Sequence, residues 1–265
     1  MTMHEFLGIG TPNASTVTEL VTIRDLTKSF DGRVVLNHVD FDVPNGSTVS
    51  IIGRSGGGKT TLMRCINLLE IPDSGLIRLE EQDIFSGTRI AWKNMARLRQ
   101  LVGMVFQRFY LFPHLTALEN VMLAQLKALK STEEEALETS LELLTQVGLR
   151  HRALAFPEQM SGGEQQRVAI ARALALKPKV LLFDEPTSAL DPESTRDVLR
   201  VMRKLGDAGM TMVIVTHEVP FAREVSDNVV FIDGGRIIEQ GPPAQVIDAP
   251  EQERTKAFLR AFDTP

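Results

Sequence analysis

Short apolar runs of three to five residues recur along the chain, separated by turn residues or by longer segments with helical spacing. Such runs favour buried β-strands that alternate with helices. Before residue 53 the predicted strands lie at 21–23, 34–36, 39–43 and 49–52, with turns at 31–32 and 44–46. The first three indicate antiparallel strands that lead into the fourth. Later strands are predicted at 75–79, 102–106, 180–183 and 212–215, followed by a hairpin of 229–232 and 236–239.

Helical spacing of apolar residues accounts for most of the remaining chain. Helices are predicted at 60–70, at 162–176, after Asp191-Pro192 and within the last 25 residues. Residues 113–156 carry no strand signal. There, Ser131 to Glu134 indicate a capping box, and a leucine stripe ends at Gly148. The stripe consists of Leu137, Leu141 and Leu144. We therefore expect a small helical subdomain, over about residues 108–160, inserted into an α/β domain.

The composition fits one domain and narrows the classes of partner. The chain has 265 residues, 43% hydrophobic and 24% charged, which suits a large α/β domain with a small insert. A net charge of −5 and the lack of any run of five basic residues argue against a nucleic-acid partner. Cys65 is the only cysteine, so no internal disulfide is expected, and its simplest role is that of a small buried residue.

The ends of the chain and its hydropathy favour a protein without its own membrane span. No apolar stretch approaches the roughly 18 residues needed to cross a bilayer. The N-terminus lacks the basic and apolar regions of a secretory signal. Residues 1–19, rich in Ser, Thr, Gly and Pro, are predicted to form a flexible tail.

Residues Gly53 to Thr60 match all the specified positions of the phosphate-binding pattern GxxxxGK[ST], directly after the predicted strand 49–52. In such a loop the glycines let backbone N–H groups surround phosphates, and Lys59 adds a positive charge. The Thr60 hydroxyl is placed to ligate Mg²⁺. A helix beginning near Lys59 points its positive dipole end at the same anion. The match makes an ordinary Gly-rich turn with a chance lysine the weaker interpretation.

Two further segments carry candidate chemistry. The apolar run 180–183 is followed by Asp184 and Glu185. Beside a phosphate loop, the first carboxylate helps to hold Mg²⁺ and the second polarises the attacking water; alone, the pair would equally suit an acidic strand–turn junction. Ser161-Gly162-Gly163-Glu164 opens a helix. It is either a simple N-cap or a second anion site at a glycine-rich helix terminus.

Together and in this order, these motifs resemble those of the ATPase subunit of an ABC transporter, over about residues 20–262. The resemblance implies a single ABC ATPase domain of α/β class. Its expected parts are a P-loop NTPase core with a mainly parallel sheet, an antiparallel β subdomain and the helical subdomain. It also implies ATP and Mg²⁺ as cofactors. The ATP-binding set carried over is Phe30, Gly53, Arg54, Ser55, Gly56, Gly57, Gly58, Lys59, Thr60, Thr61, Gln107 and Asp184.

The resemblance also assigns roles within the site. Glu185 is expected to be the general base, with His217 and Lys59 as the other catalytic residues. The residues expected on the metal are Thr60, Gln107 and Asp184. The signature residues Ser161, Gly162, Gly163 and Glu164 are expected to contact the ATP of a second subunit, and Asp191 to lie in the D-loop. Each of Phe30, Gln107, Asp191 and His217 also has an ordinary structural interpretation, as core, surface, helix-cap or strand-end residue.

Four motif positions depart from the family's pattern, and two of them, Gly57 and Thr60, replace commoner serines. Arg54 stands where Pro is common, and Glu164 stands where Gln is common. We hypothesise that Arg54 and Glu164 face each other's neighbourhood across a dimer. The aromatic Phe30 takes a position where Tyr is more frequent.

Local features are most similar to the polar amino acid uptake group of importers. They are residues 111–116, 182–193 and 253–259. The separation of 102 positions from Lys59 to Ser161 leaves no room for the long coiled coil of DNA-repair relatives. This resemblance implies an ATP-dependent homodimer at the cytoplasmic face of the inner membrane. Its partners are expected to be integral membrane permease subunits and an extracytoplasmic solute-binding protein. An ATP-dependent switch and an export or lipoprotein-release motor remain as alternatives.

One apolar segment is open to two interpretations. Residues 109–112 carry two phenylalanines, a tyrosine and a leucine. They form either part of the helical subdomain's core or an exposed surface that receives a permease.

Overall fold

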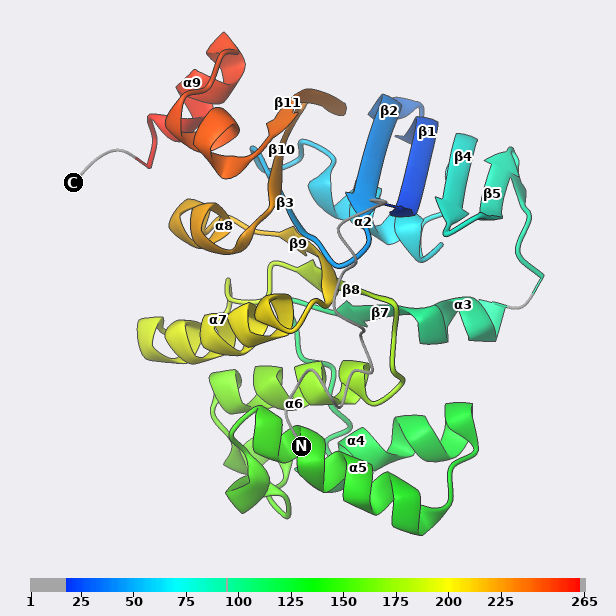
Figure 1. Cartoon of the computed structure of the whole chain (residues 1–265), viewed down its shortest axis with the longest axis vertical. Helices are drawn as coiled ribbons and strands as arrows, with labels where there is room; N and C mark the ends of the chain where they lie inside the picture. The colour runs from blue at the N-terminus through cyan, green and yellow to red at the C-terminus, as the bar shows by residue number, and fades with distance from the viewer. Residues whose placement is uncertain (1–17, 94, 263–265) are drawn as a thin grey trace.

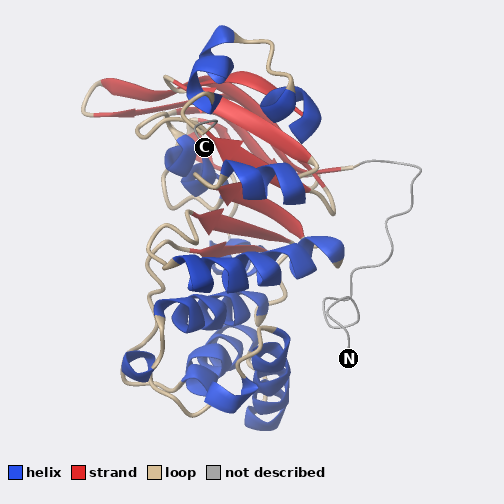
Figure 2. Cartoon of the chain, turned by 90° about the vertical axis from the view of Figure 1, so that its left-hand side faces the viewer, coloured by secondary structure: helices blue, strands red, loops and turns tan. Residues whose placement is uncertain are grey.

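The computed structural model describes residues 18–93 and 95–262. Two β-sheets lie at one end of the molecule and a group of helices at the other, as Figures 1 and 2 show. A flexible tail was expected over residues 1–19. Residues 1–17 of it lie outside the described residues, and Glu19 begins the first strand. The predicted fold class is confirmed: a mixed sheet, an antiparallel sheet and a helical subdomain are all present.

The first sheet is antiparallel and has the strand order β2-β1-β4-β5-β6. Its strands are β1 (Glu19–Phe30), β2 (Arg33–Pro44), β4 (Ser74–Leu79), β5 (Gln82–Gly87) and β6 (Arg89–Ile90). The predicted strands 34–36 and 39–43 form one strand, because the β1–β2 pairing tolerates several register shifts. Asp25 and His38, both with φ of 52°, lie at these irregularities.

The second sheet is parallel except at one edge and has the order β11-β10-β3-β9-β8-β7. Its strands are β3 (Thr48–Ile52), β7 (Val102–Val105), β8 (Val180–Asp184), β9 (Thr211–Val215), β10 (Asn228–Asp233) and β11 (Arg236–Gly241). Every residue of β3, β8 and β9 is buried, as expected for strands covered on both faces. Because β3, β8 and β9 are parallel, their carboxyl ends share one edge of the sheet.

Side chains of this sheet alternate between two hydrophobic cores. Leu182 and Val213 face the core shared with the antiparallel sheet and with helix α2 (Lys59–Ile66). Phe183 and Ile214 face the core shared with α7 (Pro192–Asp207) and the helical subdomain. Cys65, on α2, is fully buried as expected, and burial raises the pKa of its thiol to about 12.

Six helical segments form the helical subdomain and its connection to the sheet. They are α4 (Ala117–Ala124), η1 (Gln125–Leu129), α5 (Glu133–Gln146), η2 (Arg150–Arg152), η3 (Pro157–Gln159) and α6 (Gly162–Leu174). The chain leaves β7 to enter them and returns into β8, so they form an insertion at the β7 edge of the sheet.

Two details of the α5 prediction are wrong. The capping box is formed by Thr132 and Glu135, one position later than predicted. Leu137, predicted in the apolar stripe, is 41% exposed. The buried face is instead made by Ala136, Ser140, Leu143 and Leu144. These residues follow an i, i+4, i+7, i+8 spacing. The prediction missed this face because two of its members are small residues and only the leucines were counted.

The remaining helices are short and flank the sheets. They are α3 (Met95–Leu101), α8 (Val219–Val225), η4 (Ala244–Asp248) and α9 (Glu253–Leu259). The C-terminal elements are helical and short, as predicted, while α3, α8, β5 and β6 were not predicted. Among the described residues, no helix combines the length and apolar character required to traverse a bilayer.

Candidate active site

A pocket of about 540 Å³ opens between the tip of the β1–β2 hairpin and the amino end of α2. It contains most of the expected phosphate loop together with Glu185. The lining residues are Phe30, Arg33, Val34, Val35, Ser55, Gly56, Gly57, Gly58, Lys59, Thr60, Thr61, Glu185, Gly234 and Gly235. The pocket is therefore built where β3 ends and α2 begins, as the motif predicted.

The phosphate loop requires glycine at its two ends for steric reasons. Gly53 has φ of 148°, and a Cβ there would lie 2.2 Å from the Ile232 carbonyl oxygen. Gly58 has φ of 104°, and a Cβ there would lie 2.8 Å from the Val35 carbonyl oxygen. The loop is thus enclosed between β10 and β2, with Gly58 as the N-cap of α2. This close packing presents the first turn of α2 to the pocket.

Lys59 is a buried cation held inside the loop. Its Nζ donates hydrogen bonds to the carbonyl oxygens of Gly53 (2.9 Å) and Arg54 (3.0 Å). Burial lowers its pKa, while the nearby carboxylates of Glu185 and Asp184 oppose that shift. A buried ammonium with only carbonyl partners is suited to take an anion as a further partner.

Thr60 and Asp184 come together from α2 and the end of β8. The Thr60 hydroxyl donates to Asp184 Oδ1 at 3.0 Å, and Arg64 Nη2 lies 3.2 Å from Asp184 Oδ2. A hydroxyl beside a carboxylate is an oxygen donor pair that fits Mg²⁺. The described residues contain no group of three His, Cys, Asp or Glu side chains able to hold a metal. A cation here would therefore need phosphate oxygens and water to complete its coordination.

Glu185 and His217 meet at the carboxyl ends of adjacent strands β8 and β9. His217 Nε2 lies 2.9 Å from Glu185 Oε1. Glu185 has a φ of 47°, and its amide donates to the Val215 carbonyl at 3.0 Å. Glu185 lines the pocket, so a carboxylate with an imidazole partner faces the phosphate loop. This pair has the composition of a general base and its orienting group.

The signature residues lie outside this pocket. Ser161 is the N-cap of α6 and forms a capping box with Glu164. A Cβ on Gly163 would lie 2.6 Å from Ser194 Cβ, so packing against α7 already requires glycine there. Glu164 pairs with Arg152 of its own chain, with 3.1 Å between Nε and Oε1. The N-cap interpretation of Ser161 is therefore correct within one chain, and a contact with ATP of a second chain stays a prediction.

Gln107 and Asp191 also do not line the pocket. Gln107 is exposed just beyond β7, and it takes no part in the hydrogen bond between Thr60 and Asp184. Asp191 is the N-cap of α7, where hydrogen bonds from Ser194 and the neighbouring amides lower its pKa. Gly53, Arg54 and Asp184 also do not line the pocket. The first two are loop residues bonded to Lys59, and Asp184 is bonded to Thr60.

Side chains of helix α6 hydrogen-bond to the backbone around Gln107. Gln166 Nε2 donates to the Phe106 carbonyl at 3.2 Å. Arg172 donates to the carbonyls of Tyr110 (2.6 Å) and Phe109 (3.1 Å). The backbone on both sides of Gln107 is thus bonded to the helix that carries the signature residues.

Five lining residues were missed by the sequence analysis. They are Arg33, Val34, Val35, Gly234 and Gly235. The Gly235 amide donates to the Gly57 carbonyl at 3.1 Å, because β10 pairs with β3 and carries its hairpin turn beside the loop. The doublet Gly234-Gly235 was visible as a turn, yet its place beside the loop depends on pairing between distant strands.

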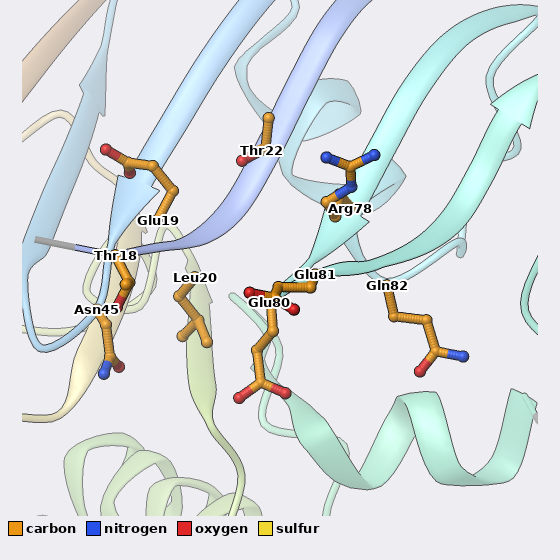
Figure 3. A pocket seen from close by; sticks show the side chains of 9 residues that line it. All are labelled: Thr18, Glu19, Leu20, Thr22, Asn45, Arg78, Glu80, Glu81 and Gln82. Carbon is orange, nitrogen blue, oxygen red and sulfur yellow. The ribbon is translucent and has the colours of Figure 1, made fainter.

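A larger pocket, of about 970 Å³, lies elsewhere and contains none of the expected site residues. Figure 3 shows its side chains around the start of β1 and the β4–β5 turn, with Glu80, Glu81 and Arg78 among them. Glu80 is paired with Lys179. This pocket contains no part of the phosphate loop and neither Glu185 nor His217, so the smaller pocket is the candidate active site.

Comparison with known proteins agrees with this geometry. Residues 36–188 match the protein-family model described as ABC transporter. The glutamine transport ATP-binding protein GlnQ of Escherichia coli (strain K12) is 50% identical over 243 residues, which cover 91% of this chain and 99% of that protein. The L-cystine import ATP-binding protein TcyC of Bacillus subtilis (strain 168) is 48% identical over 246 residues, covering 93% of this chain and 100% of that protein.

A solved structure shows the same fold. It is a dimeric structure of a post-hydrolysis state of the ATP-binding cassette MJ0796 bound to ADP and Pi. The two chains share 33% sequence identity with a TM-score of 0.75, over 84% of this chain and 98% of that chain. Together with the motif order and the pocket, these matches confirm the family predicted from the sequence. The chain belongs to the ABC transporter family, as an ATP-binding subunit similar to those of amino acid import systems.

Proposed function

We propose that this chain hydrolyses ATP to energise the import of polar amino acids through a separate membrane permease. The observation that carries the chemistry is that Glu185, which is bonded to His217, lines the same pocket as the phosphate loop. The substrate class is supported by relatives whose names specify glutamine transport and L-cystine import.

In the proposed reaction, the phosphates of ATP bind at the amino end of α2. Lys59 Nζ transfers its hydrogen bonds from the loop carbonyls to phosphate oxygens, and the loop amides supply further donors. Thr60 and Asp184 would hold Mg²⁺, with Gln107 reaching the same site after a movement of its segment. That ion would supply charge neutralisation at the phosphate oxygens.

Glu185 accepts the proton of the attacking water in this scheme. The water oxygen bonds to the γ-phosphorus, the bond from that phosphorus to the bridging oxygen breaks, and ADP leaves with the electron pair. With its proton on Nε2, His217 donates to Glu185 and fixes the carboxylate. The same N–H then serves a γ-phosphate oxygen once the nucleotide is bound. The placement of both groups at adjacent strand ends supports these roles.

A second copy of the chain completes the proposed site. Ser161, Gly162, Gly163 and Glu164 do not line the pocket of their own chain, although their helix terminus is suited to an anion. A head-to-tail homodimer would bring them onto the nucleotide of the partner, so two ATP molecules would join two chains. Loss of the γ-phosphate would remove those contacts and allow the dimer to open.

An exposed apolar surface of the helical subdomain is the proposed permease contact. It comprises Tyr110, Phe112, Leu154 and Phe156. Exposed aromatic side chains grouped on one subdomain are typical of a protein-binding surface. The chain would then lie at the cytoplasmic face of the inner membrane, and a solute-binding protein on the opposite side would deliver the amino acid.

Affinity capture from detergent-solubilised native membranes tests this proposal. Wild type carrying a tag is compared with Phe112→Asp, and with Ile90→Asp as a control of matched exposure (44% and 42%) on β6. Wild type and the control are expected to retain a multi-spanning permease, identified by mass spectrometry, and Phe112→Asp to lose most of it. Equal capture by all three proteins would contradict the proposed contact. A purely soluble set of partners would contradict import and favour an ATP-dependent switch.

A further inference from the structure

The aromatic ring at the mouth of the candidate active site has one face already covered. Phe30, at the end of β1, lines the pocket and is 40% exposed. The ammonium of Lys28 lies over its ring, 4.9 Å from the centroid. A cation at this distance is attracted by the electron-rich face of the ring. The opposite face is therefore the one that remains for a ligand.

Lys28 is itself held firmly in place. Its Nζ donates to the Ile71 carbonyl at 2.7 Å and lies 3.4 Å from Asp73 Oδ1. The side chain of Lys28 is only 14% exposed, so its charge is largely removed from water. Partial burial strengthens the attraction between a cation and an aromatic ring.

The same carboxylate also holds the backbone next to the ring. Asp73 Oδ2 accepts a hydrogen bond from the Ser29 amide at 2.6 Å, and the Asp73 amide donates to the Thr27 carbonyl at 2.8 Å. Asp73 lies in the segment that follows α2, whose other end begins at Lys59. The ring of Phe30 and the phosphate loop are thus connected through one short helix.

From this arrangement we propose that Lys28 is a positioning residue for the nucleobase of ATP. Its ammonium fixes the plane of the Phe30 ring from behind and draws electron density from it, so that a purine stacks on the free face. The inference rests on the proposed function, because it requires ATP in this pocket. It assigns to Lys28 a contribution to base recognition that is separate from phosphate binding.

Comparison of ATP with inorganic tripolyphosphate separates the two contributions. Tripolyphosphate carries the phosphate chain without a base, and both are titrated calorimetrically in the presence of Mg²⁺. Lys28→Met is expected to weaken ATP binding about 3- to 10-fold, the scale of a partly desolvated cation–π contact. Tripolyphosphate binding is expected to stay within about 2-fold of wild type, because that ligand makes no stacking contact.

Three further variants make the result specific. Lys28→Arg keeps a cation over the ring and is expected to restore ATP affinity. Lys28→Gln keeps a donor for the Ile71 carbonyl but no charge, and is expected to show the same loss as Lys28→Met. Lys256→Met, which removes a lysine paired with Glu253 on α9, is the control. Thermal melting verifies that each variant is folded.

The outcomes distinguish this inference from the proposed function. Weaker ATP binding with unchanged tripolyphosphate binding supports it, as does rescue by arginine. Equal ATP affinity of Lys28→Met and wild type overturns the inference and leaves the proposed function intact. An equal loss for both ligands also overturns it, since the role of Lys28 would then be general. A wild-type protein that binds no ATP overturns both.

Discussion

At the scale of single residues, Glu185 holds an uncommon backbone conformation. A φ of 47° in a non-glycine residue costs on the order of 1–3 kcal/mol unless the surroundings enforce it. Here its amide is bonded to Val215 in β9, and its carbonyl accepts hydrogen bonds from Ser188 at 3.3 Å and 3.0 Å. The backbone of Glu185 is thus held by hydrogen bonds at both its amide and its carbonyl, which suits the proposed role of its side chain as a general base.

Replacement of Glu185 by glutamine is expected to separate binding from hydrolysis. The amide keeps the size of the side chain and its contact with His217 but cannot accept the proton of water. Phosphate release should fall about 10²- to 10⁴-fold, the scale of a lost general base. ATP binding, followed by equilibrium dialysis, should be retained. Glu218→Gln, an exposed glutamate beside His217, serves as the control. Turnover near the wild-type rate in Glu185→Gln would remove Glu185 from this role.

Residue identities in the site were predictable where a local motif carries them. Lys59 and Thr60 follow from a pattern of adjacent positions, and the structure places both in the pocket. Arg33 and Gly235 have no such pattern, because hairpin geometry and the β10–β3 pairing bring them there. The partner of Lys28 was equally hidden, since Asp73 lies 45 positions away.

At the scale of elements, three helices begin in the same way. The capping boxes of α4, α5 and α6 each pair a Thr or Ser with a Glu three residues later. In α4, Glu119 Oε2 accepts hydrogen bonds from the Thr116 amide and hydroxyl, both at 2.8 Å. Both bonds lower the pKa of Glu119, and the bond from the backbone amide has the larger effect. The amino end of α4, which follows Phe112 of the proposed permease contact, is therefore stabilised by a carboxylate.

This carboxylate gives α4 a defined pH dependence. The pKa of Glu119 is lowered from 4.5 in the folded state, so its contribution is complete above pH 4.5 and is lost as pH falls through the folded value. Glu119→Ala is expected to lower the free energy of unfolding by about 0.3–1 kcal/mol at pH 7. The difference from wild type should narrow below pH 4.5 in urea titrations. Glu138→Ala, exposed on α5, is the control, and a pH-independent difference would contradict the capping role.

Element types were predictable wherever the apolar pattern was long and regular. Strands such as β8 and β9 are buried along their whole length, so their apolar runs are continuous. The two-residue strand β6 and the seven-residue helices α3 and α8 are too short to establish a period. The start of α5 was misplaced by one residue because Ser131 and Thr132 are both good caps.

At the scale of the whole molecule, the position of the signature residues predicts how two copies meet. Ser161 is exposed at the amino end of α6 and does not line the pocket of its own chain. In the Glu185→Gln background, which is expected to retain ATP, size-exclusion chromatography should show a dimer. Ser161→Arg in that background should remain a monomer, because a bulky cation would block the contact between chains. Ser86→Arg, on the exposed face of β5, should still dimerise. Dimer formation by the Ser161 variant would contradict the head-to-tail arrangement.

The insertion of the helical subdomain also determines where the molecule is mechanically compliant. The subdomain is attached beside β7, the edge strand, so its rotation stretches no hydrogen-bond ladder inside the sheet. Such a rotation is resisted by the bonds of Gln166 and Arg172 to residues 106–110 and by the apolar core that the subdomain shares with α7. We expect bending of the subdomain to move the segment 106–110, which these bonds join to α6. A force applied to the helices would then become an angular displacement of Gln107, while the phosphate loop keeps its shape.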